Sequence, residues 1–213
     1  MKILCCALLA AALAVWSSPI AAKPGFAEVT RALGPVQVVT LGAGHLYAGV
    51  DRRLQVYRLG DNEAPKLVYE GASEADDIAD LRVRDGRLYV AAGKSGLRIY
   101  DLAVAGRPAL LGSLALPGFK PRGLATDGSM LYAASAAAGI HVIDVSVPSA
   151  PALITVFSEA DASYVALNLR APYLYVADGQ RHLLVLDVTE PAAPQRVGRA
   201  TLPANGQQIA LRG

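Results

Sequence analysis

The chain has 213 residues, of which 53% are hydrophobic and 18% are charged, and its formal net charge is +2. Charges of both signs are scattered along it without a basic stripe, which excludes the electrostatic footprint of a nucleic-acid-binding protein. The two cysteines are Cys5 and Cys6, so the rest of the chain can form neither a disulfide framework nor a thiolate metal site.

The first 22 residues, MKILCCALLAAALAVWSSPIAA, have the composition of a secretory signal peptide. Lys2 precedes an apolar stretch, and Ser, Pro and small residues follow it. A membrane-spanning helix needs about 20 apolar residues, more than this stretch offers. We therefore predict a signal peptide over residues 1–22 with cleavage after Ala22, a secreted or periplasmic location, and a protein that is not membrane-spanning.

Residues 23–213 are predicted to form one domain, because a single repeat accounts for most of them. Leu-Tyr pairs recur at intervals of 42, 43 and 43 and begin at Leu46, Leu88, Leu131 and Leu174. Prolines recur every 43 residues, at Pro65, Pro108, Pro151 and Pro194. A period in the forties is typical of one supersecondary unit per copy, stacked on its neighbours to bury a shared core.

Each repeat is predicted to contain four β-strands. Runs such as LYVAA, LRIYD and ALLGSL are short, rich in Leu, Ile, Val and Tyr, and bounded by Gly, Asp, Ser or Pro. The pairs Asp85-Gly86 and Asp127-Gly128 indicate tight hairpin turns. Other runs, such as LLVLD, are apolar on both faces, as expected of a sheet with neighbours on both sides. The predicted fold class is therefore all-β, a β-propeller of four-stranded blades.

The repeats are expected at about 36–78, 79–120, 121–163 and 164–205. The last segment, GQQIALRG at residues 206–213, matches the first strand of a fifth, incomplete repeat, and FAEVTRALG at residues 26–34 resembles the last strand of one. We therefore expect four full blades that are part of a larger ring, of six or more blades. A self-contained four-bladed ring is the alternative.

The repeats resemble those of the LVIVD-repeat family of bacterial propeller proteins. LYVADGQRHLLVLDVTEPAAPQRVG and LYAASAAAGIHVIDVSVPSAPALI follow its pattern of YVAD, glycine and LxVIDVSDPxxPxxVG. The resemblance covers roughly residues 36–205 and is weakest in the first copy, where Arg58 replaces the Asp that ends this run in the other three copies. It implies propeller architecture and little about activity.

Residues that recur in phase are expected to build the blades. Asp101, Asp144 and Asp187 end equivalent strands, where a short carboxylate can accept N–H groups and tighten the following turn. Asp178-Gly179 is expected in a hairpin, and His182 on the same loop is expected to be exposed and unpaired. The histidines share no ligand spacing, so a zinc site has little support.

Non-repeating loop residues are better functional candidates, because scaffold folds carry function on their loops. The most distinctive segment is EGASEADDIAD, residues 70–80, which joins one blade to the next. Aligned by the repeat, Asp77 is level with Lys120, and Tyr164 is a candidate aromatic contact. We predict a charged rim on one face of the propeller, with a solvated acidic loop as the alternative. The predicted rim residues are Asp76, Asp77, Asp80, Lys120, Arg122, Glu159, Asp161 and Tyr164.

Such a rim suits a small charged ligand, a protein or peptide, or a cation such as Ca²⁺, since hard cations take several oxygen ligands. We expect a non-catalytic binding or protein-interaction module with no cofactor and no nucleic-acid partner.

An enzyme on a propeller scaffold is the alternative, either a lactonase-like hydrolase or a quinone-dependent dehydrogenase. It would need an axial site, and the inner runs VQVV, RGLAT and YVALN are poor in the necessary groups. A surface or adhesion segment of a longer protein is a third possibility.

Overall fold

The computed structural model describes residues 36–210 apart from 61–63, 105, 137 and 161–162. The predicted signal peptide and the segment 26–34 lie outside the described residues. Within them the chain is almost entirely β-structure, with a single 3-10 turn at Gly93–Ser95. The predicted all-β class is confirmed.

The strands form four antiparallel sheets of four strands, each sheet in sequence order, which we call blades 1 to 4. Blade 1 contains β1 (Val36–Gly42), β2 (His45–Val50), β3 (Arg53–Arg58) and β4 (Lys66–Glu70). Blade 2 contains β5 (Asp80–Arg84), β6 (Arg87–Ala91), β7 (Leu97–Asp101) and β8 (Ala109–Leu114). Blade 3 contains β9 (Pro121–Thr126), β10 (Met130–Ser135), β11 (Gly139–Asp144) and β12 (Ala152–Phe157). Blade 4 contains β13 (Tyr164–Arg170), β14 (Tyr173–Asp178), β15 (His182–Asp187) and β16 (Gln195–Thr201).

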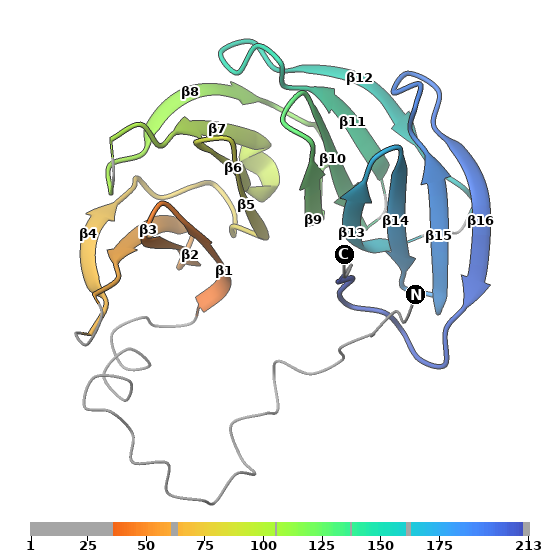
Figure 1. Cartoon of the computed structure of the whole chain (residues 1–213), viewed down its shortest axis with the longest axis horizontal. Coiled ribbons are helices and arrows are strands. Elements are labelled where there is room, and N and C mark those ends of the chain that lie inside the picture. The colour runs from red at the N-terminus through yellow and green to blue at the C-terminus, as the bar shows by residue number, and fades with distance from the viewer. Residues whose placement is uncertain (1–35, 61–63, 105, 137, 161–162, 211–213) are drawn as a thin grey trace, which may run out of the picture.

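The four blades follow one another around an arc, as in a β-propeller (Figure 1). The first strand of each blade, β1, β5, β9 or β13, lies nearest the axis, and the fourth, β4, β8, β12 or β16, lies at the perimeter. The open side of the arc lies between blades 1 and 4. The prediction of a β-propeller with four-stranded blades is thus confirmed.

The hydrophobic core lies between the blades, because each blade buries one face on the next. The tyrosine of the Leu-Tyr pair shows this most clearly. Tyr89 of blade 2 packs with Leu124 and Leu131 of blade 3 and is fully buried. Tyr47 and Tyr132 occupy the same position in their blades and are buried in the same way. These apolar contacts explain why the strands are apolar on both faces.

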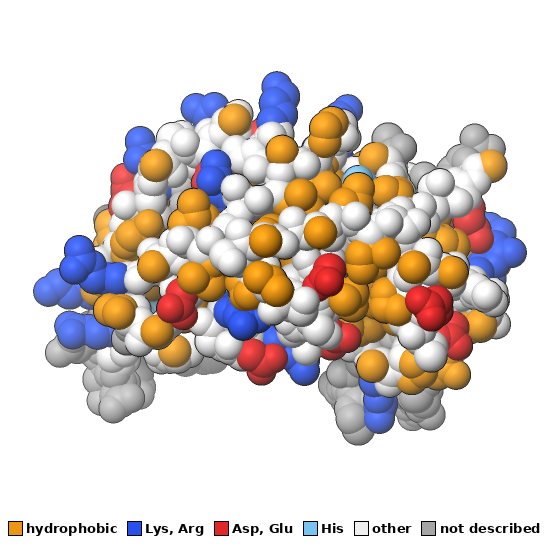
Figure 2. Space-filling view, turned by 90° about the horizontal axis from the view of Figure 1, so that it is seen from above, with side chains coloured by type: hydrophobic (Ala, Val, Ile, Leu, Met, Phe, Trp, Pro, Cys, Tyr) orange, Lys and Arg blue, Asp and Glu red, His pale blue; other side chains and the backbone are white. Residues whose placement is uncertain are grey.

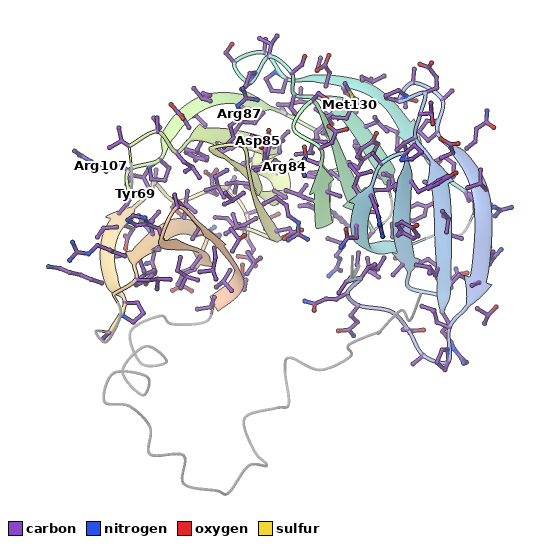
Figure 3. The ribbon with its side chains drawn as sticks, viewed as in Figure 1. Tyr69, Arg84, Asp85, Arg87, Arg107 and Met130 are labelled. Carbon is purple, nitrogen blue, oxygen red and sulfur yellow. The ribbon has the colours of Figure 1, made fainter. Side chains whose placement is uncertain are left out.

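Two kinds of turn are formed as the residues predict. Asp85 and Gly86 both have positive φ, 50° and 72°, which is the type I′ geometry that an Asp-Gly hairpin favours. The turn lies at the end of blade 2, where Asp85 and Arg84 are labelled in Figure 3. After the third strand, Asp144 Oδ1 accepts the backbone N–H of Ser146 at 2.8 Å, and Asp101 and Asp187 accept the corresponding N–H groups.

The outer strand of every blade carries a β-bulge at the same place in the repeat. Ladder pairing skips one residue on each outer strand. The skipped residues are 43 apart and all apolar and exposed: Val68, Leu111, Ile154 and Val197. The outer edge of the arc consequently shows apolar side chains interspersed with charges of both signs (Figure 2). Bulges of this kind hinder edge-to-edge pairing with another sheet.

The tail segment, residues 206–210, follows blade 4 and returns to the axis. The side-chain amide of Asn168 on β13 donates to the carbonyl of Ile209 at 3.0 Å, which holds the segment beside the innermost strand of blade 4. The sequence predicts the first strand of a fifth repeat here. The described part of it has no strand assignment, and residues 211–213 lie outside the described residues.

Candidate functional site in the axial cavity

A cavity of about 860 Å³, the axial cavity, lies where the four inner strands converge. Each inner strand contributes at least one polar side chain to its wall, and the tail segment completes the lining. These polar residues are Gln37 of β1, Asp80 and Arg82 of β5, Arg122 of β9, Asn168 of β13, and Gln207 and Gln208 of the tail segment. Concave sites of this volume that combine apolar walls with a few convergent polar groups are typical ligand sites.

Asp80 begins β5 and is buried, with 6% of its surface exposed. Its Oδ2 atom accepts the backbone N–H of Leu124 on β9 at 2.6 Å, and its Oδ1 atom accepts the N–H of Leu81 at 2.8 Å. Burial raises the pKa of Asp80, although the neighbouring Arg82 and these two N–H donors favour the ionised form. The carboxylate is therefore fully engaged with the scaffold.

Arg82 lies two residues further along β5 and completes what we call the Asp80–Arg82 clamp. Its Nη2 atom is 3.1 Å from Asp80 Oδ2, its Nε atom donates to the carbonyl of Leu124 at 2.8 Å, and its Nη1 atom donates to the carbonyl of Leu81 at 3.3 Å. Both the backbone N–H and the backbone carbonyl of Leu124 in blade 3 are thus hydrogen-bonded to side chains of blade 2. The clamp fastens β5 to β9 at the axis by polar contacts.

Arg122, at the start of β9, is exposed and lines the axial cavity. Its guanidinium makes no ion pair or hydrogen bond with another described residue. Arginine stays protonated throughout the physiological range, so Arg122 presents to the cavity a positive charge that no described residue neutralises.

The predicted rim residues are only partly brought together. Asp80 and Arg122 both line the axial cavity. The described residues show no ion pair between Asp76 or Asp77 and either Lys120 or Arg122. Of the predicted rim, the described residues thus bring Asp80 and Arg122 to one cavity and place Asp76, Asp77, Lys120, Glu159 and Tyr164 elsewhere.

Three charged residues of the predicted rim, Asp76, Asp77 and Lys120, lie on the loops that lead into blades 2 and 3. Asp76 Oδ1 accepts the backbone N–H of Asp77 at 3.0 Å, and the Asp76 side chain packs over Gly93, where an added Cβ would lie 2.6 Å from Asp76 Cβ. Asp77 and Lys120 are exposed, and the Lys120 backbone N–H donates to Ser135 Oγ at 3.0 Å. These contacts shape the loops and leave the Asp77 carboxylate and the Lys120 ammonium in solvent.

Glu159 and Tyr164 of the predicted rim have structural partners in blade 4. Glu159 forms an ion pair with Arg196 of β16 at 2.9 Å. Tyr164 is 1% exposed, and its hydroxyl accepts the Glu159 N–H at 3.0 Å, so its ring belongs to the core and not to a rim surface. Burial raises the pKa of Tyr164. Asp161 lies outside the described residues.

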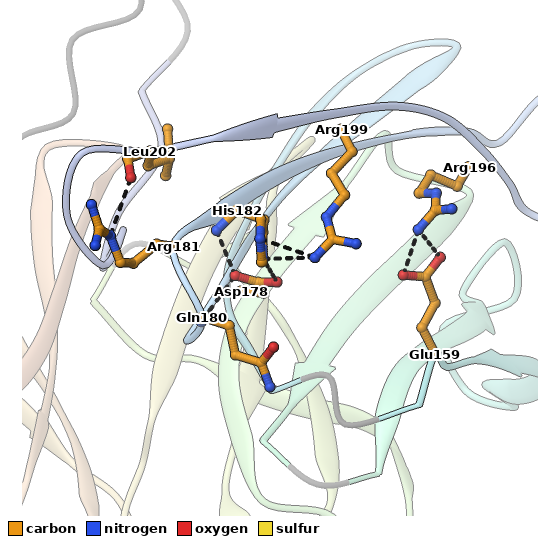
Figure 4. A network of polar contacts seen from close by, with 8 residues as sticks. All are labelled: Glu159, Asp178, Gln180, Arg181, His182, Arg196, Arg199 and Leu202. Carbon is orange, nitrogen blue, oxygen red and sulfur yellow. Dashed lines mark hydrogen bonds and ion pairs between the residues drawn. The ribbon is translucent and has the colours of Figure 1, made fainter.

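The Asp178–His182 loop forms a polar network at one end of blade 4 (Figure 4). Asp178 Oδ1 accepts the backbone N–H groups of Gln180 and His182, as expected of a hairpin residue, and its Oδ2 atom lies 2.8 Å from His182 Nδ1. Arg199 Nη2 is 3.0 Å from both ring nitrogens of His182. The expectation of an exposed, unpaired His182 is wrong, because this loop histidine is held between a carboxylate and a guanidinium.

Sequence analysis overlooked Arg82, Asn168 and the three glutamines of the axial cavity. A signal for two of them was present: Arg82 and Asn168 occupy the same place in their repeats, 86 residues apart, where the other copies have Val39 and Ala125. Polar residues that interrupt an otherwise apolar inner strand mark the axis of a propeller. Gln37 interrupts the apolar run of β1 in the same way. Gln207 and Gln208 gave no comparable signal, because they reach the cavity through the path of the tail segment.

The described residues contain no group of three or more His, Cys, Asp or Glu side chains arranged to hold a metal ion. Nor does the described part of the chain contain a helix with the length and apolar character needed to cross a membrane.

Comparisons with solved structures agree on the fold. A protein from Lactobacillus plantarum superimposes with a TM-score of 0.68 at 17% identity, over 80% of this chain and 57% of that one. Two computationally designed proteins, Ika8 and Ika4, superimpose with TM-scores of 0.61 and 0.60, both at 14% identity. The match covers 82% of this chain and 51% of Ika8, and 72% of this chain and 91% of Ika4. At these identities the likeness concerns the fold alone.

No curated protein matches the sequence. The family model of the LVIVD repeat matches residues 121–158 and 164–201. These segments begin with the innermost strand of blades 3 and 4 and end at the outermost one, so each match is one blade. The chain therefore carries two adjacent LVIVD repeats, which form blades 3 and 4 of its β-propeller.

Proposed function

We propose that this propeller is a non-catalytic binding module and that its ligand occupies the axial cavity. One observation carries the proposal: all four inner strands and the tail segment place polar side chains on the same cavity of about 860 Å³. Those side chains are guanidinium and carboxamide groups and one carboxylate that is already ion-paired, which are groups that bind and orient ligands. The rigid blades behind them hold the groups in place.

We also propose that the module acts outside the cytoplasm. The support is the composition of residues 1–22, which is that of a cleavable secretory signal. Expression of the chain with a C-terminal tag, followed by cell fractionation and N-terminal sequencing of the tagged product, tests this. A product that begins at Lys23 in the exported fraction is expected, and an uncleaved product in the cytoplasm would contradict the proposal.

The cavity itself is tested by filling it. Gln37 is exposed on β1 and lines the cavity, so Gln37→Trp adds bulk to the cavity without displacing a core side chain. Lys66→Trp places the same bulk on the outermost strand of the same blade and is the matched control. Saturation-transfer NMR with a library of small polar metabolites measures binding to the unmodified protein and to both variants.

We expect the compounds that bind the unmodified protein to lose their signal with Gln37→Trp and to keep it with Lys66→Trp. Compounds that bind all three proteins equally would place the ligand site away from the axis. Circular dichroism of both variants establishes that each retains the β-sheet fold.

A further inference from the structure

The charged groups of the axial cavity do not balance. Among the described residues that line it, the cavity has one carboxylate, Asp80, and two guanidinium groups, Arg82 and Arg122. Asp80 and Arg82 neutralise each other at 3.1 Å, and each nitrogen of the Arg82 guanidinium already has an oxygen partner from the carboxylate or the backbone. The clamp thus has no charge left for a ligand, and within the described lining the single positive charge of Arg122 remains without a counter-charge.

The groups around Arg122 are neutral and suited to polar ligands. Gln37, Gln207 and Gln208 are exposed residues of the cavity wall. The Nδ2–H group of Asn168 donates to the carbonyl of Ile209. The Oδ1 atom of Asn168 can then accept a hydrogen bond from a ligand. Carboxamides offer both donors and acceptors, so they can satisfy the uncharged polar part of a ligand whose charge is met by Arg122.

We propose that the axial cavity binds a molecule carrying a single carboxylate, with Arg122 as the group that holds it. This inference rests on the proposed function and adds the chemical class of the ligand. A guanidinium presents two parallel N–H donors that match the two oxygens of a carboxylate. One carboxylate also cancels the one free charge of the cavity, whereas a phosphate dianion exceeds it, and a cation meets the wrong sign.

Two sources of a single carboxylate fit these groups: a small hydroxy acid and the C-terminus of a peptide. The probes are lactate with lactamide as its neutral counterpart, and N-acetyl-tetraalanine with a free or an amidated C-terminus. NMR titration gives the Kd of each probe for the unmodified protein, Arg122→Gln and Arg122→Lys. Lys120→Gln is the matched control, because Lys120 is an exposed cation two residues away that does not line the cavity.

For at least one probe pair we expect the acid to bind the unmodified protein about tenfold or more tightly than the amide, as for a charge-assisted pair. Arg122→Gln should abolish this preference, Arg122→Lys should retain part of it, and Lys120→Gln should leave it unchanged. A preference shown by the lactate pair alone identifies a small acid as the ligand, and one shown by the peptide pair alone identifies a chain terminus. Either result supports the proposal.

The inference is overturned if acids and amides bind equally, if neither acid binds, or if Arg122→Gln keeps the preference for acids. It is also overturned if inorganic phosphate competes with the acids at equal or higher affinity. These failures are distinct from failure of the proposed function, because Gln37→Trp reports on occupancy of the cavity by any compound, whatever its charge.

Discussion

At the scale of single residues, the Asp80–Arg82 clamp connects the fold with the candidate site, because it joins two blades at the wall of the axial cavity. Asp80 accepts N–H groups from its own strand and from β9, and Arg82 bonds to the carbonyl of the same Leu124. Removal of the carboxylate leaves a buried N–H of Leu124 and part of the Arg82 guanidinium without a partner. Such losses cost more than the interaction itself contributes.

We predict that Asp80→Ala lowers the free energy of unfolding by about 2–4 kcal/mol. Asp77→Ala, three residues earlier on the loop that leads into β5, removes an exposed carboxylate and should change the free energy of unfolding by less than about 0.5 kcal/mol. Urea denaturation of both variants measures the difference. Equal effects of the two substitutions would mean that the clamp does not fasten the blades.

One repeat position shows why the loop at residues 70–80 differs from its counterparts. One position of the third strand, with members 43 residues apart, is Gln55, Arg98, His141 or Leu184 in blades 1 to 4. Arg98 pairs with Glu74 of the preceding loop at 2.8 Å, and His141 packs edge-on against Phe119 of its own preceding loop, with ring centroids 5.1 Å apart. In blades 2 and 3, the loop that precedes the blade thus supplies a partner for the side chain at this position of the third strand. At Glu74, the difference between this loop and its counterparts therefore reflects packing against Arg98.

His141 provides a pH-dependent prediction. Burial lowers its pKa from the ordinary value of 6.5, so the folded protein favours the neutral ring. The unfolded chain then binds more protons below that value, and stability falls as the pH drops from 6.5 through the lowered pKa. The slope is at most about 1.4 kcal/mol per pH unit for one proton.

His141→Leu copies the residue that blade 4 has at this position and removes the titrating group. Thermal unfolding between pH 7.5 and pH 4.5 should show a smaller loss of stability for this variant than for the unmodified protein. The substitution also removes a buried Nδ1 atom that has no hydrogen-bond partner among the described residues. Identical pH profiles for the two proteins would refute the assignment.

At the residue scale the sequence predicts scaffold groups better than ligand groups. The turn-closing roles of Asp144 and Asp187 follow from their recurrence, since a short carboxylate at a fixed place in each repeat has the same N–H groups nearby. Recurrence carries no information about which unique residues meet. Asp77 and Lys120 are level in the alignment, yet each stays on its own loop because neighbouring blades diverge away from the axis. Among the described rim residues, those on the innermost strands, Asp80 and Arg122, share one cavity.

At the scale of strands and turns, contacts between adjacent blades decide which residues are replaceable. Gly112 on β8 and Gly198 on β16 occupy the same position in their repeats. A Cβ at Gly112 would lie 2.2 Å from the carbonyl oxygen of Pro148, in the turn of the next blade. A Cβ at Gly198 would meet only the Val185 side chain of its own blade, at 3.5 Å.

We therefore predict that Gly112→Ala destabilises the protein by about 1–3 kcal/mol, because the opposing group is backbone and has little freedom to move. Gly198→Ala should be neutral or stabilising by up to about 1 kcal/mol, since it only restricts the unfolded chain. Chemical denaturation of the pair measures both. A similar loss in both variants would show that β-strand glycines matter here for reasons unrelated to blade packing.

The strands are predicted well from this sequence, because a short apolar run that is ambiguous in one repeat can be recognised from its counterparts in the other three. The hairpin at Asp85-Gly86 is likewise fixed by two residues that tolerate positive φ. The tail segment is the exception. Residues 206–210 match an innermost strand in sequence but form no ladder, and a strand needs a partner whose backbone groups are free to pair with it. Asn168 holds the segment by a side-chain contact instead.

At the scale of the whole molecule, the arc is held together by blade faces rather than by one central core. The four tyrosines of the Leu-Tyr pairs show the consequence. Tyr47, Tyr89 and Tyr132 are almost fully buried because a blade follows each of them, whereas Tyr175 in blade 4 is only half-buried. The 43-residue period predicts this stacking from sequence alone. It does not predict the axial cavity, because the cavity depends on how the blades are arranged around the arc.

The same stacking determines the site. Equivalent strands meet at the axis, so one position in the repeat supplies both Arg82, which fastens two blades, and Asn168, which positions the tail segment. The proposed function therefore depends on the differences between repeats at their innermost strands, while the residues that recur from repeat to repeat build the blades that hold those strands.

Hydrogen–deuterium exchange of the intact chain, read at peptide or residue resolution, tests this stacking most directly. If four blades bury their faces on one another, protection should rise and fall with a period of 43 residues. It should be highest in the two middle strands of each blade, such as β6 and β7, and lowest in the outer strands with their bulges. Protection without that period, or outer strands that exchange more slowly than middle strands, would contradict the account.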